Sequence, residues 1–217
     1  MKPFRASYYI KGQLIDHYTE NAKCYRCGSN IRQRFIATFL MNNTNILCSK
    51  IKLLHFAPER TIFSLLKAQQ NIEYITCDLN PSSYPGAIEL DITDIRFQKE
   101  TFDAIICIHV LEHVKDDLKA IRELYRVIRP GGWALIAVPI YGEKTFEDPE
   151  LDYHGREKRY GIGDHLRMYG LDLENRLFDA GFSVNTLSID DVPGSYIDRS
   201  VASPHMESDK YLFFCTK

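Results

Sequence analysis

The sequence has no long apolar run: no stretch approaches the roughly 18 consecutive apolar residues that a membrane-spanning helix needs. Its first residues also lack the apolar segment of a secretory signal peptide. Low-complexity tracts are absent, and 45% of the residues are hydrophobic while 26% are charged, which is typical of an ordered domain. We therefore expect a cytoplasmic protein without a membrane partner.

A strong net charge of either sign is missing as well. The 27 Lys and Arg residues nearly balance the 29 Asp and Glu residues, and the net charge of −2 argues against a nucleic-acid partner for the whole molecule. Residues 1–35 nevertheless carry seven basic and two acidic residues, a local balance of +5. This segment is either an ordinary solvated face or an arm that binds a polyanion.

Cysteine is too sparse for a disulfide framework, with six among 217 residues. Cys77 and Cys107 lie in apolar, strand-like runs, which predicts buried free thiols in a reducing compartment. Cys24 and Cys27 form a single Cys-x-x-Cys pair. A structural zinc site needs four ligands, so this pair alone does not predict a bound metal.

Glycine-rich phosphate-binding loops are missing too. Neither the G-x-G-x-x-G fingerprint of dinucleotide sites nor the G-x-x-x-x-G-K-[ST] loop of nucleoside triphosphate sites occurs. A nucleoside ligand of this chain is therefore expected to lack a di- or triphosphate.

What the sequence does contain is an alternation of strand-like and helix-like segments. The near-continuous apolar run from Phe102 to Val110 is typical of a central parallel strand covered on both faces. The alternation predicts an α/β fold with a Rossmann-like, doubly wound, mostly parallel sheet of seven strands. The expected strands are 52–56, 72–77, 87–90, 102–110, 133–139, 182–189 and 211–216.

The remaining segments are assigned around this sheet. Residues 1–48 are expected to form an N-terminal extension with the Cys-x-x-Cys pair and a helix capped by Ser29. Residues 49–217 form the α/β domain, with an inserted cap at 140–170 that is rich in charge, glycine and aromatic residues. The helix after the central strand is expected to stop at Pro130–Gly132.

Residues suited to a nucleoside stand where the expected strands end, which is where open α/β sheets bind ligands. Asp78 follows the second strand, 21 residues after Ala57, about the spacing at which an acid binds a ribose diol. Asp91 and Ile92 follow the third strand and suit an adenine amino group and ring face, and His109 ends the fourth. Because no phosphate cradle is present, this edge favours S-adenosylmethionine (SAM) over NAD or ATP.

Several segments resemble the successive motifs of class I SAM-dependent methyltransferases. They lie between about Leu53 and Pro139, at Asp91–Asp94, Phe102-Asp103, His109–Val114 and Arg129–Gly132. A bacterial subgroup is still more similar, with Cys-x-x-Cys-Gly-Ser, Leu-His-x-Ala-Pro-Glu and Asp-His-x-Arg-x-Tyr-Gly segments. These segments stand here at 24–29, 54–59 and 164–170.

The resemblance implies a set of SAM-binding residues. Asp78 would bind the ribose, residues 91–92 would hold the adenine, and His109 would lie beside the methionine portion or the sulfonium. The turn that follows the first strand would pass under the methionine portion. The full implied set is His55, Phe56, Ala57, Glu59, Asp78, Leu79, Asp91, Ile92 and His109.

The first motif departs from the family pattern. The family has alternate glycines where this sequence has Ala57, Glu59 and Thr61, and glycine lets the backbone approach a ligand closely. The departure indicates either a variant binding loop, as in the subgroup, or a relative that no longer binds SAM.

Methyl transfer from a sulfonium is an in-line displacement, and a hydroxyl or ammonium acceptor is helped by a general base. Structural alternatives stay open for two of the candidates: His109 could be a satisfied core histidine, and His113 could belong, with Glu112, to a solvated helix start. The candidate catalytic residues are His109, His113, His165 and Tyr169.

The cap supplies the candidates for acceptor binding, which are Asp164, Arg167 and Tyr169. If residues 163–170 are helical, these side chains and His165 share roughly one face. The alternative is a structural ion pair that pins the cap.

The expected function is transfer of a methyl group from SAM to an oxygen or nitrogen of a small-molecule acceptor by a monomer or homodimer. The acceptor is expected to be a sugar, a phosphorylated metabolite or a surface-polysaccharide precursor. Two alternatives remain: a protein or nucleic-acid methyltransferase, favoured by the basic segment 1–35, and a non-catalytic Rossmann-like binding or scaffold protein, favoured by the altered first motif.

Overall fold

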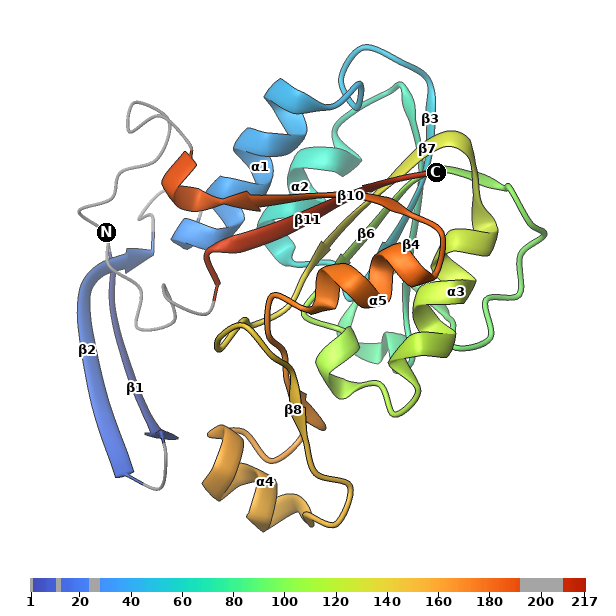
Figure 1. The fold of residues 1–217 in the computed structure, drawn as a ribbon. Helices are drawn as coiled ribbons and strands as arrows, with labels where there is room; N and C mark the ends of the chain where they lie inside the picture. The colour runs from blue at the N-terminus through green and yellow to red at the C-terminus, as the bar shows by residue number, and fades with distance from the viewer. Residues whose placement is uncertain (1, 11–12, 24–27, 192–208) are drawn as a thin grey trace.

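A central seven-stranded sheet organises the chain in the computed structural model, which describes residues 2–10, 13–23, 28–191 and 209–217 (Figure 1). The strand order is β10-β11-β7-β6-β3-β4-β5. The strands from β5 to β7 are parallel, whereas β11 is antiparallel to both of its neighbours. The bounds are β3 Ile51–Phe56, β4 Ile72–Asp78, β5 Ile88–Glu89, β6 Phe102–Ile108, β7 Ile128–Ala137, β10 Ser183–Ser188 and β11 Tyr211–Thr216.

This sheet confirms the expected fold class, and each expected strand has a counterpart close to its predicted position. The chain order reverses between β3 and β6, which are neighbours at the centre of the sheet. The loops after these two strands therefore diverge and leave room for a ligand at their carboxyl ends.

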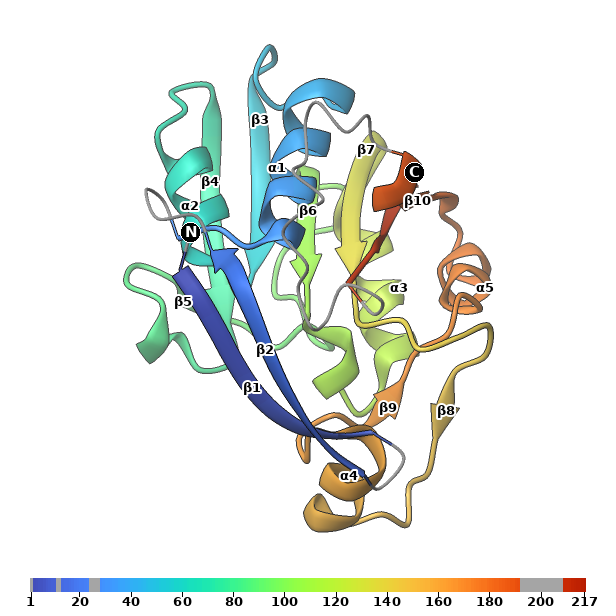
Figure 2. The same ribbon diagram turned by 90° about the vertical axis from the view of Figure 1, so that its left-hand side faces the viewer.

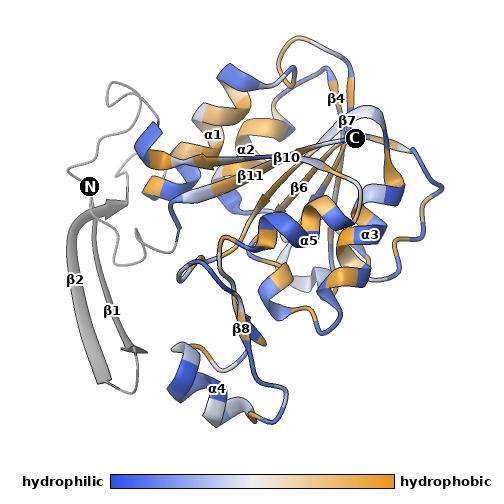
Figure 3. Cartoon of the chain, viewed as in Figure 1, coloured by the Kyte–Doolittle hydropathy of each residue, from blue (hydrophilic) through white to orange (hydrophobic). Residues whose placement is uncertain are grey.

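Helices cover both faces of the sheet (Figure 1). The helices α1 (Ile31–Asn43) and α2 (Arg60–Lys67) lie on one face, and α3 (Asp117–Val127) and α5 (Leu173–Asp179) lie on the other. The two faces have separate apolar cores, and the adjacent residues Leu53 and Leu54 of β3 belong to opposite ones. Figure 3 shows the central strand β6 as predominantly apolar, as expected for a strand buried on both faces.

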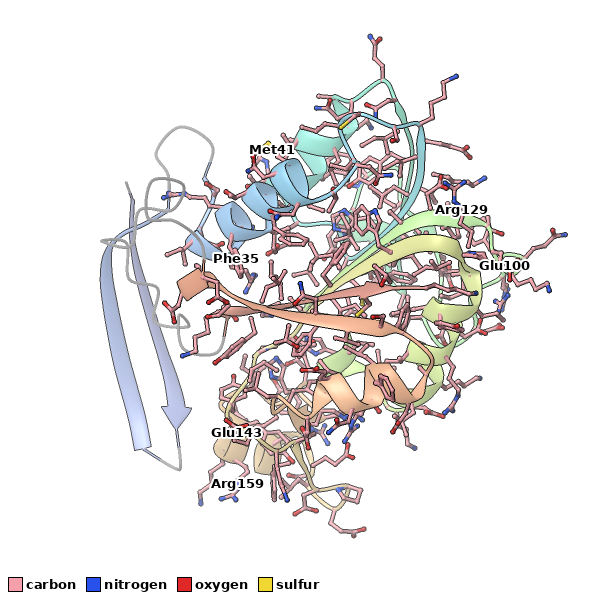
Figure 4. The ribbon with its side chains drawn as sticks, turned by 45° about the horizontal axis from the view of Figure 1, so that its top comes forward. Phe35, Met41, Glu100, Arg129, Glu143 and Arg159 are labelled. Carbon is pink, nitrogen blue, oxygen red and sulfur yellow. The ribbon has the colours of Figure 1, made fainter. Side chains whose placement is uncertain are left out.

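Helix α1 packs directly on the sheet. Its N-cap is Asn30, one residue after the predicted Ser29, because the Asn30 side chain and Gln33 form a reciprocal capping box. Phe35 is buried toward the sheet, whereas Met41 lies on the exposed side of the helix (Figure 4). Residues of α1 and β3 belong to the same apolar core. The domain boundary expected at residue 48 therefore falls between two elements that share one core.

The N-terminal segment contains a β-hairpin, whereas only a helix and the Cys-x-x-Cys pair were expected there. Strands β1 (Lys2–Ile10) and β2 (Gln13–Lys23) pair antiparallel, as Figure 2 shows. The Tyr- and Ile-containing runs on either side of Lys11-Gly12 are the sequence signal that could have indicated a hairpin. The Cys24 and Cys27 pair lies outside the described residues.

The Pro130–Gly132 segment is part of a strand and does not end a helix, which corrects the sequence-based expectation. Helix α3 already ends at Val127, and β7 starts at Ile128. Gly132 is required there because a Cβ atom at this position would lie 2.7 Å from the carbonyl oxygen of Asp103.

The cap after β7 is made of short elements: β8 (Phe146–Glu147), α4 (Tyr153–Tyr160) and β9 (Arg167–Met168). Residues 163–170 are not helical, so the condition under which their side chains would share one face is not met: α4 ends at Tyr160, and β9 pairs antiparallel with β8. Gly161 causes the early end, since its left-handed φ of 84° at the C-cap stops the helix. Among the residues described here, no helix has the length and apolarity to cross a bilayer.

Candidate active site

A cleft of about 1370 Å³ opens at the carboxyl ends of β3, β4 and β6. It lies at the point where the strand order reverses, the position at which doubly wound sheets bind ligands. Seven of the nine residues implied as SAM contacts line it: Phe56, Ala57, Asp78, Leu79, Asp91, Ile92 and His109.

The turn after β3 keeps a glycine-like backbone although it contains alanine. Ala57 has φ 45°, in the left-handed region, and its N–H donates to the carbonyl oxygen of Cys77 at 2.9 Å. Three non-glycine residues have positive φ in the described part of the chain, Ala57, Glu100 and His109, and two of them line the cleft. Such backbone strain costs about 1–2 kcal/mol per residue and clusters at functional sites.

Two carboxylates of the cleft wall are oriented by their own turns. Oδ1 of Asp78 accepts the N–H of Asn80 at 2.7 Å. Oδ1 of Asp91 accepts both the N–H and the hydroxyl of Thr93, at 2.7 and 2.8 Å. Ile92 beside Asp91 is 6% exposed and gives this wall an apolar surface. The arrangement can bind hydroxyl and amino groups beside a flat apolar ring.

His55 and Glu59 do not line this cleft, which corrects the SAM contacts expected for both. The His55 side chain is fully buried, and its Nδ1 lies 2.7 Å from the hydroxyl of Tyr74. Burial lowers the pKa of His55 to about 3, so the imidazole is neutral. Glu59 instead accepts hydrogen bonds from α1, at 2.6 Å from Arg32 and 3.3 Å from Gln33.

The segment after β6 carries the buried charges of the site. His109 lies with Nδ1 3.3 Å from Oε1 of Glu112 and Nε2 3.4 Å from Oδ1 of Asp209. Glu112 is 1% exposed, so it does not belong to a solvated helix start. Burial raises the pKa of Glu112 above its ordinary value, and the neighbouring His109 partly opposes this shift.

His113 and His165 meet across the gap between the 3-10 turn Leu111–His113 and the cap. Their rings make an edge-to-face contact with centroids 4.9 Å apart. His113 lines the cleft, and its Nδ1 lies 3.2 Å from the carbonyl oxygen of Asp164. His165 is 4% exposed, and burial together with His113 lowers its pKa to about 4.

Arg167 and Tyr169 fasten the cap to the turn after β6. Arg167 is 4% exposed and forms an ion pair with Glu147 at 2.8 Å. The Tyr169 hydroxyl donates to Asp117 at 2.6 Å, and burial raises its pKa well above the ordinary range. Arg167 also donates to the carbonyl oxygens of Leu111, Val114 and Lys115.

These contacts match the structural alternative considered for the cap and differ from a row of acceptor-binding side chains on one helix face. Tyr169 is 1% exposed and is not among the residues that line the cleft. Its place among the candidate bases is therefore corrected to a positioning role. Asp164 and Arg167 do reach the cleft wall, and His165 lies behind His113.

Sequence reasoning missed the acid at the far side of His109. Asp209 lies two residues before β11 and forms an ion pair with Arg32 of α1 at 2.7 Å. Residues 32, 109 and 209 are too far apart in the chain for any spacing rule to join them. Nothing in the sequence signals this contact.

Comparisons with known proteins agree with the fold. Residues 53–136 match the methyltransferase domain family. The chain is 30% identical over 118 residues to 2-phytyl-1,4-beta-naphthoquinone methyltransferase of Arabidopsis thaliana, a match that covers 44% of this chain and 42% of that protein. It covers less than half of the length of the curated relatives that it matches.

Solved structures share the architecture at low sequence identity. A SAM-dependent methyltransferase from Archaeoglobus fulgidus matches with TM-score 0.58 and 15% identity, over 88% of this chain and 95% of that one. Phosphoethanolamine N-methyltransferase 2 of Haemonchus contortus, solved with S-adenosylhomocysteine, matches with TM-score 0.59 and 14% identity, over 87% and 53% of the two chains. Residues 53–136 thus resemble a methyltransferase domain, and the chain has the fold that these solved methyltransferases share.

Proposed function

We propose that this protein transfers the methyl group of SAM to an oxygen or nitrogen atom of a small-molecule acceptor. The observation that carries the proposal is the convergence of seven residues, chosen by motif position, on one cleft at the switch point of the sheet. SAM is a nucleoside derivative without phosphate groups. The cleft suits such a ligand, because its wall has Asp78 and Asp91, each oriented by hydrogen bonds in its own turn, and the sequence contains no phosphate-binding loop.

Each part of the cofactor has a matching part of the wall. Asp78 binds the ribose hydroxyls, Asp91 accepts the adenine amino group, and Ile92 covers the ring face. The left-handed turn at Ala57 lets the backbone approach the methionine portion. His109, which ends β6 and lines the cleft, lies at the methyl-transfer end and is the proposed general base.

The charge of the cleft fits a cationic ligand. Its lining contains seven acidic residues and three basic ones, Lys115, Arg167 and Arg176. SAM carries a sulfonium and an ammonium against one carboxylate, so it is attracted by this surface. A phosphorylated acceptor would be repelled, so we narrow the acceptor to a neutral, hydroxyl-bearing or amino-bearing molecule.

Titration calorimetry with SAM and S-adenosylhomocysteine tests the cofactor site. We expect micromolar binding by the wild-type protein and at least tenfold weaker binding by Asp78→Asn, which loses the charged acceptor of the ribose hydroxyls. Asp94→Asn is the matched control, since Asp94 is exposed, pairs with Arg96 and does not line the cleft. Absence of binding at millimolar SAM would overturn the proposal and favour the scaffold alternative.

Matched pairs of acceptors test the charge argument. Release of S-adenosylhomocysteine is measured with sugars and with the same sugars carrying a phosphate. We expect turnover with the neutral member of a pair, because the acidic lining repels its phosphorylated counterpart. A preference for the phosphorylated members would contradict the narrowed acceptor class.

A further inference from the structure

Three side chains at the inner end of the cleft have the donor atoms of a metal site. Glu112, His113 and His165 each offer one ligand atom, and these atoms all lie within 4.8 Å of one another. Glu112 and His113 come from the turn after β6, and His165 comes from the cap. The N–H of Leu166 donates to the carbonyl oxygen of Glu112 at 2.8 Å, so the backbone itself holds the two segments together.

The same cluster contains buried polar atoms that the protein leaves unsatisfied. Both carboxylate oxygens of Glu112 and Nδ1 of His165 are buried without a hydrogen-bond partner in the described part of the molecule. His109 lies 3.3 Å from Glu112, but not in hydrogen-bonding geometry. Burying a carboxylate without a donor or a cation costs several kcal/mol, so this arrangement indicates a missing positive partner.

We propose that Glu112, His113 and His165 bind one divalent transition-metal ion of the zinc class. Two imidazoles and one carboxylate form a ligand set used by catalytic zinc sites, which keep a further position open. The same set with open positions also binds iron(II), whereas Mg²⁺ and Ca²⁺ prefer oxygen ligands alone.

Small changes in side-chain torsion angles would bring the three ligand atoms to coordination distance. Ligand atoms about 2.1 Å from a tetrahedral metal lie about 3.4 Å apart, so distances of up to 4.8 Å close by small side-chain torsions. His113 has the second contact that metal-bound histidines commonly make, because its Nδ1 faces the carbonyl oxygen of Asp164 at 3.2 Å. Arg167 fixes the turn that carries two of the ligands.

His113 is the exposed member of the cluster and lines the cleft wall, so an ion held by these residues would be accessible from the cleft. This step rests on the proposed methyltransferase function. An ion held there would lower the pKa of an acceptor hydroxyl bound to it, and His109 would accept the proton of that hydroxyl. The oxygen lone pair then forms the bond to the methyl carbon while the C–S bond breaks, and that electron pair stays on sulfur as neutral S-adenosylhomocysteine.

Metal binding is measured without cofactor or acceptor, so that the result is independent of the proposed activity. The full chain carries Cys24→Ser and Cys27→Ser to remove the other ligand pair, is stripped with chelator, and is titrated with Zn²⁺ by calorimetry. We expect one equivalent to bind with micromolar or tighter affinity. Glu112→Gln and His165→Gln each weaken this affinity at least tenfold, and His154→Gln, an exposed histidine on α4, leaves it unchanged.

Thermal unfolding separates a metal ligand from a purely structural carboxylate. We expect Zn²⁺ to raise the Tm of the wild-type protein and not that of Glu112→Gln. Without metal, Glu112→Gln should be as stable as the wild type or more stable, because it removes an uncompensated buried charge. Zinc binding that is absent, or equally tight in Glu112→Gln and His165→Gln, would overturn the metal site, whereas SAM binding alone decides the methyltransferase proposal.

Discussion

The hydroxyl of Tyr169 in the cap donates a 2.6 Å hydrogen bond to the carboxylate of Asp117, the first residue of α3. Arg176 of α5 pairs with the same carboxylate at 2.7 Å. The cap, α3 and α5 therefore share one buried acid. The contact positions the cap against the helix that follows the histidine-bearing turn.

Replacement of Tyr169 by phenylalanine tests whether this residue positions the cap or transfers a proton. Asp117 keeps Arg176 as a partner, so we expect a loss of about 1–2 kcal/mol in the free energy of unfolding, measured with urea. SAM affinity should change less than threefold. Tyr153→Phe, at an exposed position of α4, is the control and should be neutral. Unchanged stability together with loss of turnover would instead favour a general base.

Replacement of Arg167 by lysine should be more damaging. The guanidinium donates to three carbonyl oxygens of the turn after β6, and an ammonium group on a flexible stem cannot reproduce this fork. We expect a loss of about 2–4 kcal/mol in urea unfolding, since buried carbonyl groups lose their donors. Arg159→Lys is the matched change on α4. Equal stability of the two variants would contradict the role of Arg167 as the fastener of the cap.

Substitutions at Ala57 should show whether its left-handed backbone conformation is strained. Glycine relieves the left-handed φ of 45°, so we expect Ala57→Gly to be neutral or to stabilise by up to about 1 kcal/mol. Ala57→Val should destabilise by about 2 kcal/mol, because a β-branched residue is a genuine outlier at positive φ. Thermal unfolding measures both.

Ala68→Gly is the control for the Ala57 series. Ala68 is the C-cap of α2 and has an ordinary φ of −74°, so glycine there should destabilise by about 0.5–1 kcal/mol. If Ala57→Gly is as destabilising as Ala68→Gly, the turn does not carry the strain assigned to it.

His55 should make the protein sensitive to acid. Its pKa is lowered to about 3 in the folded state, so between that value and about pH 6.5 only the unfolded chain binds the proton. The contribution of His55 to the free energy of unfolding is then constant above about pH 6.5. Below that pH it falls with decreasing pH, by up to about 1.4 kcal/mol per pH unit. We expect His55→Asn to have a flatter pH dependence of unfolding between pH 6.5 and 4.5; an unchanged slope would be inconsistent with a neutral buried imidazole.

The sequence predicted the parts of the fold that depend on local pattern. Apolar runs located the sheet strands, and the spacing of Phe35 and its neighbours located the buried face of α1. Acids at strand ends located Asp78 and Asp91 on the cleft wall, because parallel strands bring their carboxyl ends to one edge.

The parts that the sequence did not predict depend on contacts between distant segments. The edge-to-face pair of His113 and His165 joins positions 52 residues apart, and no periodicity connects the turn after β6 with the cap. The helical spacing assumed for Asp164 and its neighbours failed because tertiary pairing with β8 prevailed over local pattern. The burial of Glu112 could not be predicted for the same reason, because the sequence does not show that the cap packs over this residue.

The fastening of β9 by Arg167 has a consequence for how the molecule opens. A lid can swing only if its contacts with the body are weak, yet this strand is held by a buried guanidinium and by the Leu166-to-Glu112 backbone bond. The turn after β6 and residues 164–169 should therefore behave as one cooperative unit in hydrogen exchange, with protected amides that are released together. We therefore expect ligands to enter the cleft past Leu79, which follows β4 and is 70% exposed, without displacement of the turn after β6.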